Sequence, residues 1–160
     1  MIKRVACAFI SLITILSLLS SCGKPEYKYC ELVIPLDSDF KKTENENYDA
    51  SFTDGESVVA IVRISFVAAY NEGIPETLTP YEFGKFWLRK CGRDAEIMSE
   101  GGVSFSTYYE KQNEREYFYL ESFLRSGSAY FVVLFVTSKS NEEAGRAEFL
   151  DYSSKIYFTE

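Results

Sequence analysis

One run of seven apolar residues, Tyr130–Val136 (YFVVLFV), constrains the fold of this chain more than any other feature. A strand with one face in water alternates apolar and polar residues, whereas a strand covered on both faces is apolar throughout. The run therefore predicts a central strand over 129–138, with other elements packed on both faces of its sheet. The 160 residues are enough to supply those covering layers within one domain.

Several other segments are rich in β-branched and aromatic residues and predict strands. They cover 31–35, 48–53, 57–66, 95–98, 103–109 and 115–124, with a short last piece at 156–158. Asp54-Gly55 predicts a hairpin turn, because this pair readily adopts positive φ angles. Gly101-Gly102, Gln112-Asn113 and Ser126-Gly127 mark the turns of a later meander.

Two helices are predicted from capping residues and apolar spacing. Thr79, Pro80 and Glu82 form a capping-box pattern, and Gly92 ends the helix. The apolar stripe expected on this helix is Phe83, Phe86, Trp87 and Cys91. A second helix is expected from Ser140, capped through Glu143, with Ala144, Ala147, Phe149 and Leu150 toward the core.

The predicted order is a strand, a β-hairpin, a helix, a β-meander and a helix. Sequential antiparallel strands with two or three separated helices predict an α+β domain over 30–160. We expect a central antiparallel sheet of about six to seven strands, flanked by helices on both faces.

This order of elements resembles the PsbP-like family, whose fold is also seen in a Ran-binding nuclear import factor. The resemblance rests on the segments YDASFTDGESVVAIVRISF, LTPYEFGKFWLRKC, VSFSTYYEKQNEREYFYLESFLRSGSAYFVVLFV and AEFLDYSSKIYF. It implies an α/β/α sandwich. It also implies an accessory or binding role, since the plant members support photosystem II and the known members are not enzymes. No residue pattern for a photosystem or metal site is present to carry over.

The N-terminus predicts a lipoprotein signal peptide over 1–21. Lys3 and Arg4 precede an apolar stretch too short for a transmembrane helix, and Leu19-Ser20-Ser21-Cys22 reads as a lipobox. We expect cleavage before Cys22, acylation of that cysteine, and a polar tether over 22–29. The chain would then be anchored to a cell membrane, facing the extracytoplasmic side, or to the outer membrane of a diderm host.

Charge argues against a nucleic-acid partner. Loss of Lys3 and Arg4 would leave 15 basic residues against 24 acidic ones, a net charge of −9. Nucleic acids and anionic lipid surfaces both require basic protein surface. We therefore expect no nucleic-acid binding, and membrane attachment through the acyl chains alone.

Cys30 and Cys91 are the two cysteines left once Cys22 is lipidated. Disulfides persist outside the cytoplasm, so these two could form a bridge. They could equally be free thiols, which are common as small apolar side chains.

The chain has no histidine, and this removes the commonest general base and zinc ligand. An enzyme would have to rely on carboxylates, lysine, tyrosine or a free cysteine. The acidic residues Glu44, Glu46, Asp49, Asp54 and Glu56 lack the alternating spacing of a calcium loop. We expect no enzymatic activity, no metal and no cofactor.

Aromatic residues make up 16% of the sequence and suggest a binding surface. The candidate partner-binding residues are Tyr108, Tyr109, Tyr117, Tyr119 and Arg63. Tyrosine offers rigid contact area for a peptide, a glycan or a protein, although cross-strand pairing would also explain these rings. We expect a non-enzymatic module that binds a protein or small ligand. An inhibitor or solute-capturing lipoprotein, or a carboxylate-based enzyme, remains the alternative.

Overall fold

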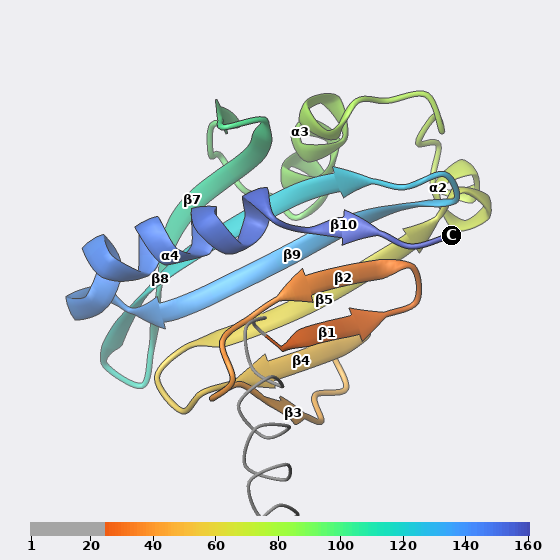
Figure 1. The fold of residues 1–160 in the computed structure, drawn as a ribbon. Helices are drawn as coiled ribbons and strands as arrows, with labels where there is room; N and C mark the ends of the chain where they lie inside the picture. Colours follow the sequence, from red (N-terminus) through yellow and green to blue (C-terminus); the bar gives the residue numbers. More distant parts are fainter. Residues whose placement is uncertain (1–24) are drawn as a thin grey trace, which may run out of the picture.

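A computed structural model describes residues 25–160 and contains two antiparallel sheets (Figure 1). The large sheet has seven strands in the order β3-β4-β5-β9-β8-β7-β6, and the small sheet has the order β1-β2-β10. The large-sheet strands are β3 (Lys41–Thr43), β4 (Ala50–Thr53), β5 (Val58–Ser65), β6 (Met98–Glu100), β7 (Val103–Gln112), β8 (Arg115–Arg125) and β9 (Ala129–Ser138). The α+β class and the seven-stranded antiparallel sheet are as predicted.

The central position of β9 follows from its apolar sequence. The strand lies between β5 and β8, and residues 129–135 are all buried. The β4–β5 hairpin is also confirmed, with Thr53 paired to Val58 across a loop that contains Gly55 at φ 99°. Asp54 accepts hydrogen bonds from the backbone N–H groups of Glu56 (2.8 Å) and Ser57 (2.7 Å), which fixes the loop.

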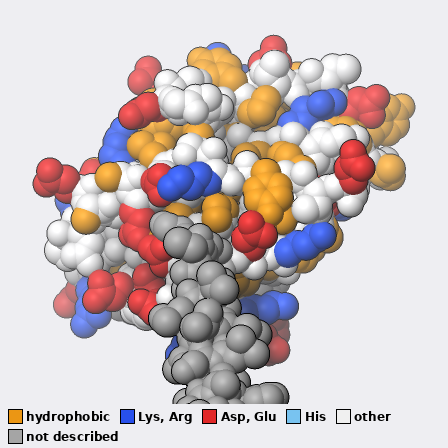
Figure 2. Space-filling view, viewed as in Figure 1, with side chains coloured by type: hydrophobic (Ala, Val, Ile, Leu, Met, Phe, Trp, Pro, Cys, Tyr) orange, Lys and Arg blue, Asp and Glu red, His pale blue; other side chains and the backbone are white. Residues whose placement is uncertain are grey.

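The first face of the large sheet is covered by α4 (Glu142–Ser154) and by the small sheet, formed by β1 (Glu26–Tyr29), β2 (Leu32–Pro35) and β10 (Tyr157–Phe158) (Figure 1). Leu32 and Ile34 from β2 and Phe149 and Tyr152 from α4 are fully buried against the large sheet. On the side of the molecule seen in Figure 2, acidic, basic and hydrophobic side chains are interspersed.

The second face is covered at one end by α2 (Phe66–Asn71) and α3 (Pro80–Lys90). The capping box predicted for α3 is present, because the side chains of Thr79 and Glu82 each accept a hydrogen bond from the backbone N–H of the other residue. Phe83 is buried in the predicted stripe, but Cys91 is exposed and Leu88 takes its place in the core. Helices on both faces of the sheet confirm the predicted layers.

The tether expected over 22–29 extends too far, because its last four residues form β1. The segment Glu26–Tyr29 alternates polar and aromatic side chains and pairs with β2. Tyr27 packs edge-on against Phe52 and donates a hydrogen bond to the carbonyl of Phe40. The folded domain therefore begins at Glu26 rather than at residue 30.

The last helix also departs from its prediction. A 3₁₀ turn, Lys139–Asn141, comes first, and the hydroxyls of Ser138 and Ser140 hydrogen-bond each other at 2.9 Å. The expected cap at Ser140 is therefore not formed, and α4 begins at Glu142. Its core face carries Phe149 as expected, whereas Ala144 and Ala147 are exposed and the buried positions also include Gly145, Tyr152 and Ser153.

Cys30 and Cys91 are both exposed free thiols, so the bridge between them is not formed. Cys30 lies in the turn between β1 and β2, and Cys91 ends α3, so the two belong to layers on opposite faces of the large sheet. The predicted signal peptide and the lipidation site Cys22 lie outside the described residues. Within residues 25–160, no helix has the length and apolar character needed to cross a membrane.

Candidate binding surface

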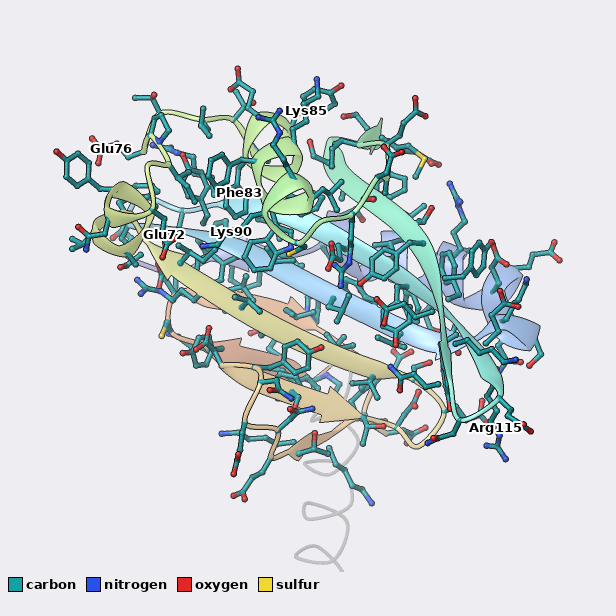
Figure 3. All side chains as sticks on the ribbon, turned by 180° about the vertical axis from the view of Figure 1, so that it is seen from behind. Glu72, Glu76, Phe83, Lys85, Lys90 and Arg115 are labelled. Atoms are coloured by element: carbon teal, nitrogen blue, oxygen red, sulfur yellow. The ribbon has the colours of Figure 1, made fainter. Side chains whose placement is uncertain are left out.

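Within residues 25–160, one half of the second face of the large sheet has no helix across it. Figure 3 shows α2 and α3 over one end of this face, while the end toward Arg115 is left without a helix. Three buried residues of the sheet, Ala60, Tyr119 and Leu134, form a separate cluster there. Partly buried hydrophobic residues that pack on this cluster are Tyr48, Tyr108, Tyr117 and Val136. We call Tyr48, Tyr108, Tyr117 and Tyr119 the tyrosine surface.

Strand alternation and register place these rings together. Residues 117 and 119 lie two apart on β8 and therefore share a face. Tyr108 on β7 is the direct cross-strand partner of Tyr119. Their rings stack with centroids 4.9 Å apart and planes 9° from parallel. Gln112 donates a hydrogen bond of 2.8 Å to the hydroxyl of Tyr119. The rings are thus held in fixed orientations, as a contact surface requires.

Arg93 and Glu121 close the surface on the side of α3. The Arg93 guanidinium lies 4.2 Å from the centroid of the Tyr108 ring and donates a hydrogen bond to Glu121. Tyr108 also donates to Glu121, at 3.2 Å. Glu121 is only 3% exposed, and burial raises its pKa although Arg93 opposes that change. The pair fixes the position of the Tyr108 ring, and the Glu121 carboxyl is too enclosed to meet a substrate directly.

The phenols of Tyr108 and Tyr119 remain protonated at neutral pH. Burial raises the pKa of Tyr108, and the nearby Glu121 carboxylate raises it further. Burial and the charge of Glu110 likewise raise the pKa of Tyr119. These two hydroxyl groups are therefore hydrogen-bond donors rather than nucleophiles or bases.

Beyond Tyr117 the surface continues into a hollow of about 640 Å³ at the end of the sheet. Arg115 and Glu56 line it, together with Lys139, whose ammonium group forms a 2.9 Å ion pair with Glu116. The hollow is therefore polar and of mixed charge, in contrast to the aromatic cluster beside it.

The structure separates two predicted residues from the other three. Tyr109 points to the first face, where it donates a hydrogen bond to Glu142 of α4 and lies under the ammonium group of Lys139. Arg63 also lies on the first face and pairs with Glu31 at 3.3 Å, which connects the small sheet to the large one. The structure thus brings together Tyr108, Tyr117 and Tyr119.

Sequence reasoning missed Tyr48 and Arg93. Tyr48 lies in the turn before β4, and Arg93 follows Gly92, which ends α3 at φ 67°. The strand predicted over 48–53 begins at Ala50 instead, and Arg93 falls outside every predicted strand and helix, so alternation placed neither residue on this face. The only local signal was the glycine, which marks where the chain turns back toward the sheet but not where the arginine points.

No protein-family model matches the sequence, and no curated protein matches it either. The fold is similar to a crystal structure from Bacteroides thetaiotaomicron, with a TM-score of 0.58 and 12% identity over 87% of this chain and 50% of that one. The chain therefore spans half the length of that protein.

Two further solved structures are similar to the chain. The solution structure of cyanobacterial PsbP from a Synechocystis species has a TM-score of 0.46 and 12% identity, covering 88% of this chain and 99% of that one. LpqN of Mycobacterium tuberculosis, described as involved in cell envelope biogenesis, has a TM-score of 0.44 and 10% identity, covering 89% and 88%. At these identities the comparisons concern the fold alone. With helices on both faces of its antiparallel sheet, the chain has the α+β fold expected from its sequence.

Proposed function

We propose that this chain is a non-enzymatic binding module and that the tyrosine surface is where it contacts its partner. The observation that carries the proposal is that, within residues 25–160, no helix covers the half of the second face where the four tyrosines gather. Tyrosine is enriched among the residues that dominate binding energy at protein interfaces. The stacked pair Tyr108 and Tyr119 is already ordered, so little conformational entropy is lost on binding.

A binding role fits the chemistry of the surface better than catalysis does. The carboxyl group beside the rings, Glu121, is buried and paired with Arg93. The raised pKa of Tyr108 leaves a phenol that donates hydrogen bonds but does not act as a base. General acid–base catalysis requires a group that reaches the substrate and titrates near the working pH.

The second candidate function is capture of a small solute, and the hollow beside Tyr117 favours it. The hollow has room for a small molecule and offers Arg115 together with the Lys139–Glu116 pair. A solute held there would require these charged groups, whereas a protein partner would require the tyrosine rings. Substitutions at the two places therefore distinguish the candidates.

We further propose that the module is displayed on the extracytoplasmic side of a membrane by lipid on Cys22. The motif Leu19-Ser20-Ser21-Cys22 supports this. Glu26, where β1 starts, is four positions after Cys22, a distance of at most about 14 Å when fully extended. A domain held on so short a connection would bind partners at or near the membrane.

The proposal is tested by crosslinking membranes that contain the full chain and recovering its partners. The test variant is Tyr48→Ser with Tyr117→Ser, and the matched control is Tyr70→Ser, which alters a tyrosine that is 81% exposed on α2. We expect the double variant to recover its partners at least about tenfold less efficiently, and the control to match the wild type. Thermal unfolding of each variant verifies that the domain is intact. Equal recovery from an intact double variant would refute the proposal.

A Cys22→Ala form tests the anchoring. We expect it to leave the membrane fraction, whereas continued membrane retention would contradict lipidation at Cys22.

A further inference from the structure

The edges of the large sheet differ in how they are protected from pairing with another chain. Unpaired strand edges attract foreign strands, and proteins protect them with short strands, lysines or capping contacts. At one edge, β3 has three residues, of which two are Lys41 and Lys42. The end of β5 extends past β4, and Asp49 covers its backbone there. The Asp49 carboxylate accepts a hydrogen bond of 2.6 Å from the N–H of Arg63, and the Asp49 N–H donates one of 2.9 Å to the carbonyl of Ile61.

The other edge is open along most of β7. This strand has ten residues, but β6 pairs only with Val103–Phe105. Figure 1 shows β7 at the margin of the sheet. The unpaired part, residues 106–112, is longer than the whole of β3 and contains a single lysine, Lys111.

The pairing pattern identifies which backbone groups of β7 face outward. In an antiparallel pair, alternate residues direct both their N–H and C=O groups toward the partner strand. Gln112 and Arg115 flank the two-residue turn to β8 and therefore bond to each other. The outward-facing residues are then Thr107, Tyr109 and Lys111. Within residues 25–160, the N–H and C=O groups of these three have no hydrogen-bond partner.

Side chains beside this edge offer contacts on both faces of the sheet. Tyr108 faces the tyrosine surface, and Tyr109 is 47% exposed on the opposite face. Two cations also lie here. Lys111 is on the edge itself, and Arg146 of α4 lies 5.8 Å from the centroid of the Phe105 ring on β7. Neither cation forms an ion pair with another residue in the described part of the chain.

We propose that β7 binds an extended peptide segment of a partner protein as an additional strand of the sheet. The open N–H and C=O groups of Thr107, Tyr109 and Lys111 supply the main-chain hydrogen bonds, which give such complexes their affinity. Apolar or aromatic side chains at adjacent positions of the peptide point to opposite faces of the sheet, where one lies against Tyr108 and the other against Tyr109. An acidic group on the peptide pairs with Lys111 and Arg146. The inference rests on the proposed binding function and assigns it a peptide partner and a binding mode.

A proline substitution separates strand pairing from every other kind of contact. The N–H of Thr107 points away from β8, so Thr107→Pro removes an outward donor while leaving the β7–β8 ladder intact. Thr107→Val is the matched control, because it keeps the N–H and the β-branched shape. The probe is a library of random twelve-residue peptides displayed on phage, selected against the full chain in detergent.

We expect the selected peptides to carry adjacent apolar or aromatic residues and an acidic group. Thr107→Pro should weaken their binding at least about tenfold, while Thr107→Val should bind as the wild type does. Hydrogen exchange of the wild-type chain provides a second readout that needs no variant. The amides of Thr107, Tyr109 and Lys111 should exchange rapidly in the free protein and slowly with peptide bound.

Three results would overturn the inference. The first is peptide binding that leaves these three amides unprotected. The second is binding that is lost in the Tyr48→Ser and Tyr117→Ser variant but kept in Thr107→Pro, which would leave the proposed binding function standing without strand pairing. The third is self-association of the chain that Thr107→Pro abolishes, because a second copy would then be the strand that β7 binds.

Discussion

Glu31 connects the small sheet to the large one, and its replacement should expose how strongly the two are joined. The residue lies in the turn between β1 and β2 and is 19% exposed. It accepts hydrogen bonds from the hydroxyls of Ser126 (2.9 Å) and Ser128 (2.6 Å) in the β8–β9 loop, and from the guanidinium of Arg63 on β5 (3.3 Å). Glu31→Gln keeps the shape of the side chain and removes its charge.

The size of the effect follows from the pKa of the carboxyl group. Burial alone would raise it, but the hydrogen bonds from Ser128, Arg63 and Ser126 outweigh burial and hold the pKa at about 2, against an ordinary value of 4.5. A difference of that size corresponds to roughly 3 kcal/mol of folding free energy at neutral pH. Partial exposure screens the charges, and the amide oxygen of the substituted side chain would still accept one bond. We therefore expect Glu31→Gln to lower the free energy of unfolding by about 1–2 kcal/mol.

The contribution of Glu31 to the free energy of unfolding should depend on pH. Because the pKa is lower in the folded state, the stabilisation is fully present above pH 4.5 and is lost as pH falls toward 2. Urea unfolding of residues 25–160 should show wild type and Glu31→Gln differing at pH 7 and converging near pH 2. Glu96→Gln, at an exposed position before β6, is the control and should follow the wild type. A difference between wild type and Glu31→Gln that stays constant with pH would refute the reasoning.

Three further outcomes are expected. Gly84→Ala in α3 would place a Cβ atom 2.7 Å from Cδ2 of Phe123, so it should destabilise the domain by about 1–3 kcal/mol in urea unfolding, and an unchanged midpoint would show that the helix can shift away. Arg93→Ala leaves the Glu121 carboxyl buried without its cation and should cost about 3 kcal/mol, most of which should be recovered when Glu121→Leu is added. Cys30 and Cys91 should both react with a maleimide without prior reduction, and mass spectrometry that finds them bridged would contradict the structure.

The sequence patterns within β9 and at the start of α3 were enough to predict both elements. The continuous apolar run of β9 specified a strand buried on both faces, and the bounds Ala129–Ser138 agree with the structure. Thr79, Pro80 and Glu82 specified the start of α3 through a cap that forms within the helix itself. Both signals depend on neighbouring residues alone, so they need no knowledge of tertiary contacts.

Other elements depend on contacts that no local pattern contains. The strand β1 depends on the packing of Tyr27 against Phe52, which is 25 positions away in the sequence.

The same limit applied to the binding surface. Alternation shows that Tyr108 and Tyr109 lie on opposite faces of their strand, but which of those faces has no helix across it depends on how α3 and α4 pack. A sequence could therefore indicate an aromatic surface without indicating which rings form it.

Site-specific photo-crosslinking tests the central claim most directly. A benzophenone amino acid placed at position 117, on the tyrosine surface, reports what contacts that half of the sheet in the full chain. The same group at position 70, on α2, is the control. Our account predicts a discrete crosslinked partner from position 117 that is not obtained from position 70. Equal crosslinking from both positions, or a partner obtained from position 70 alone, would contradict it.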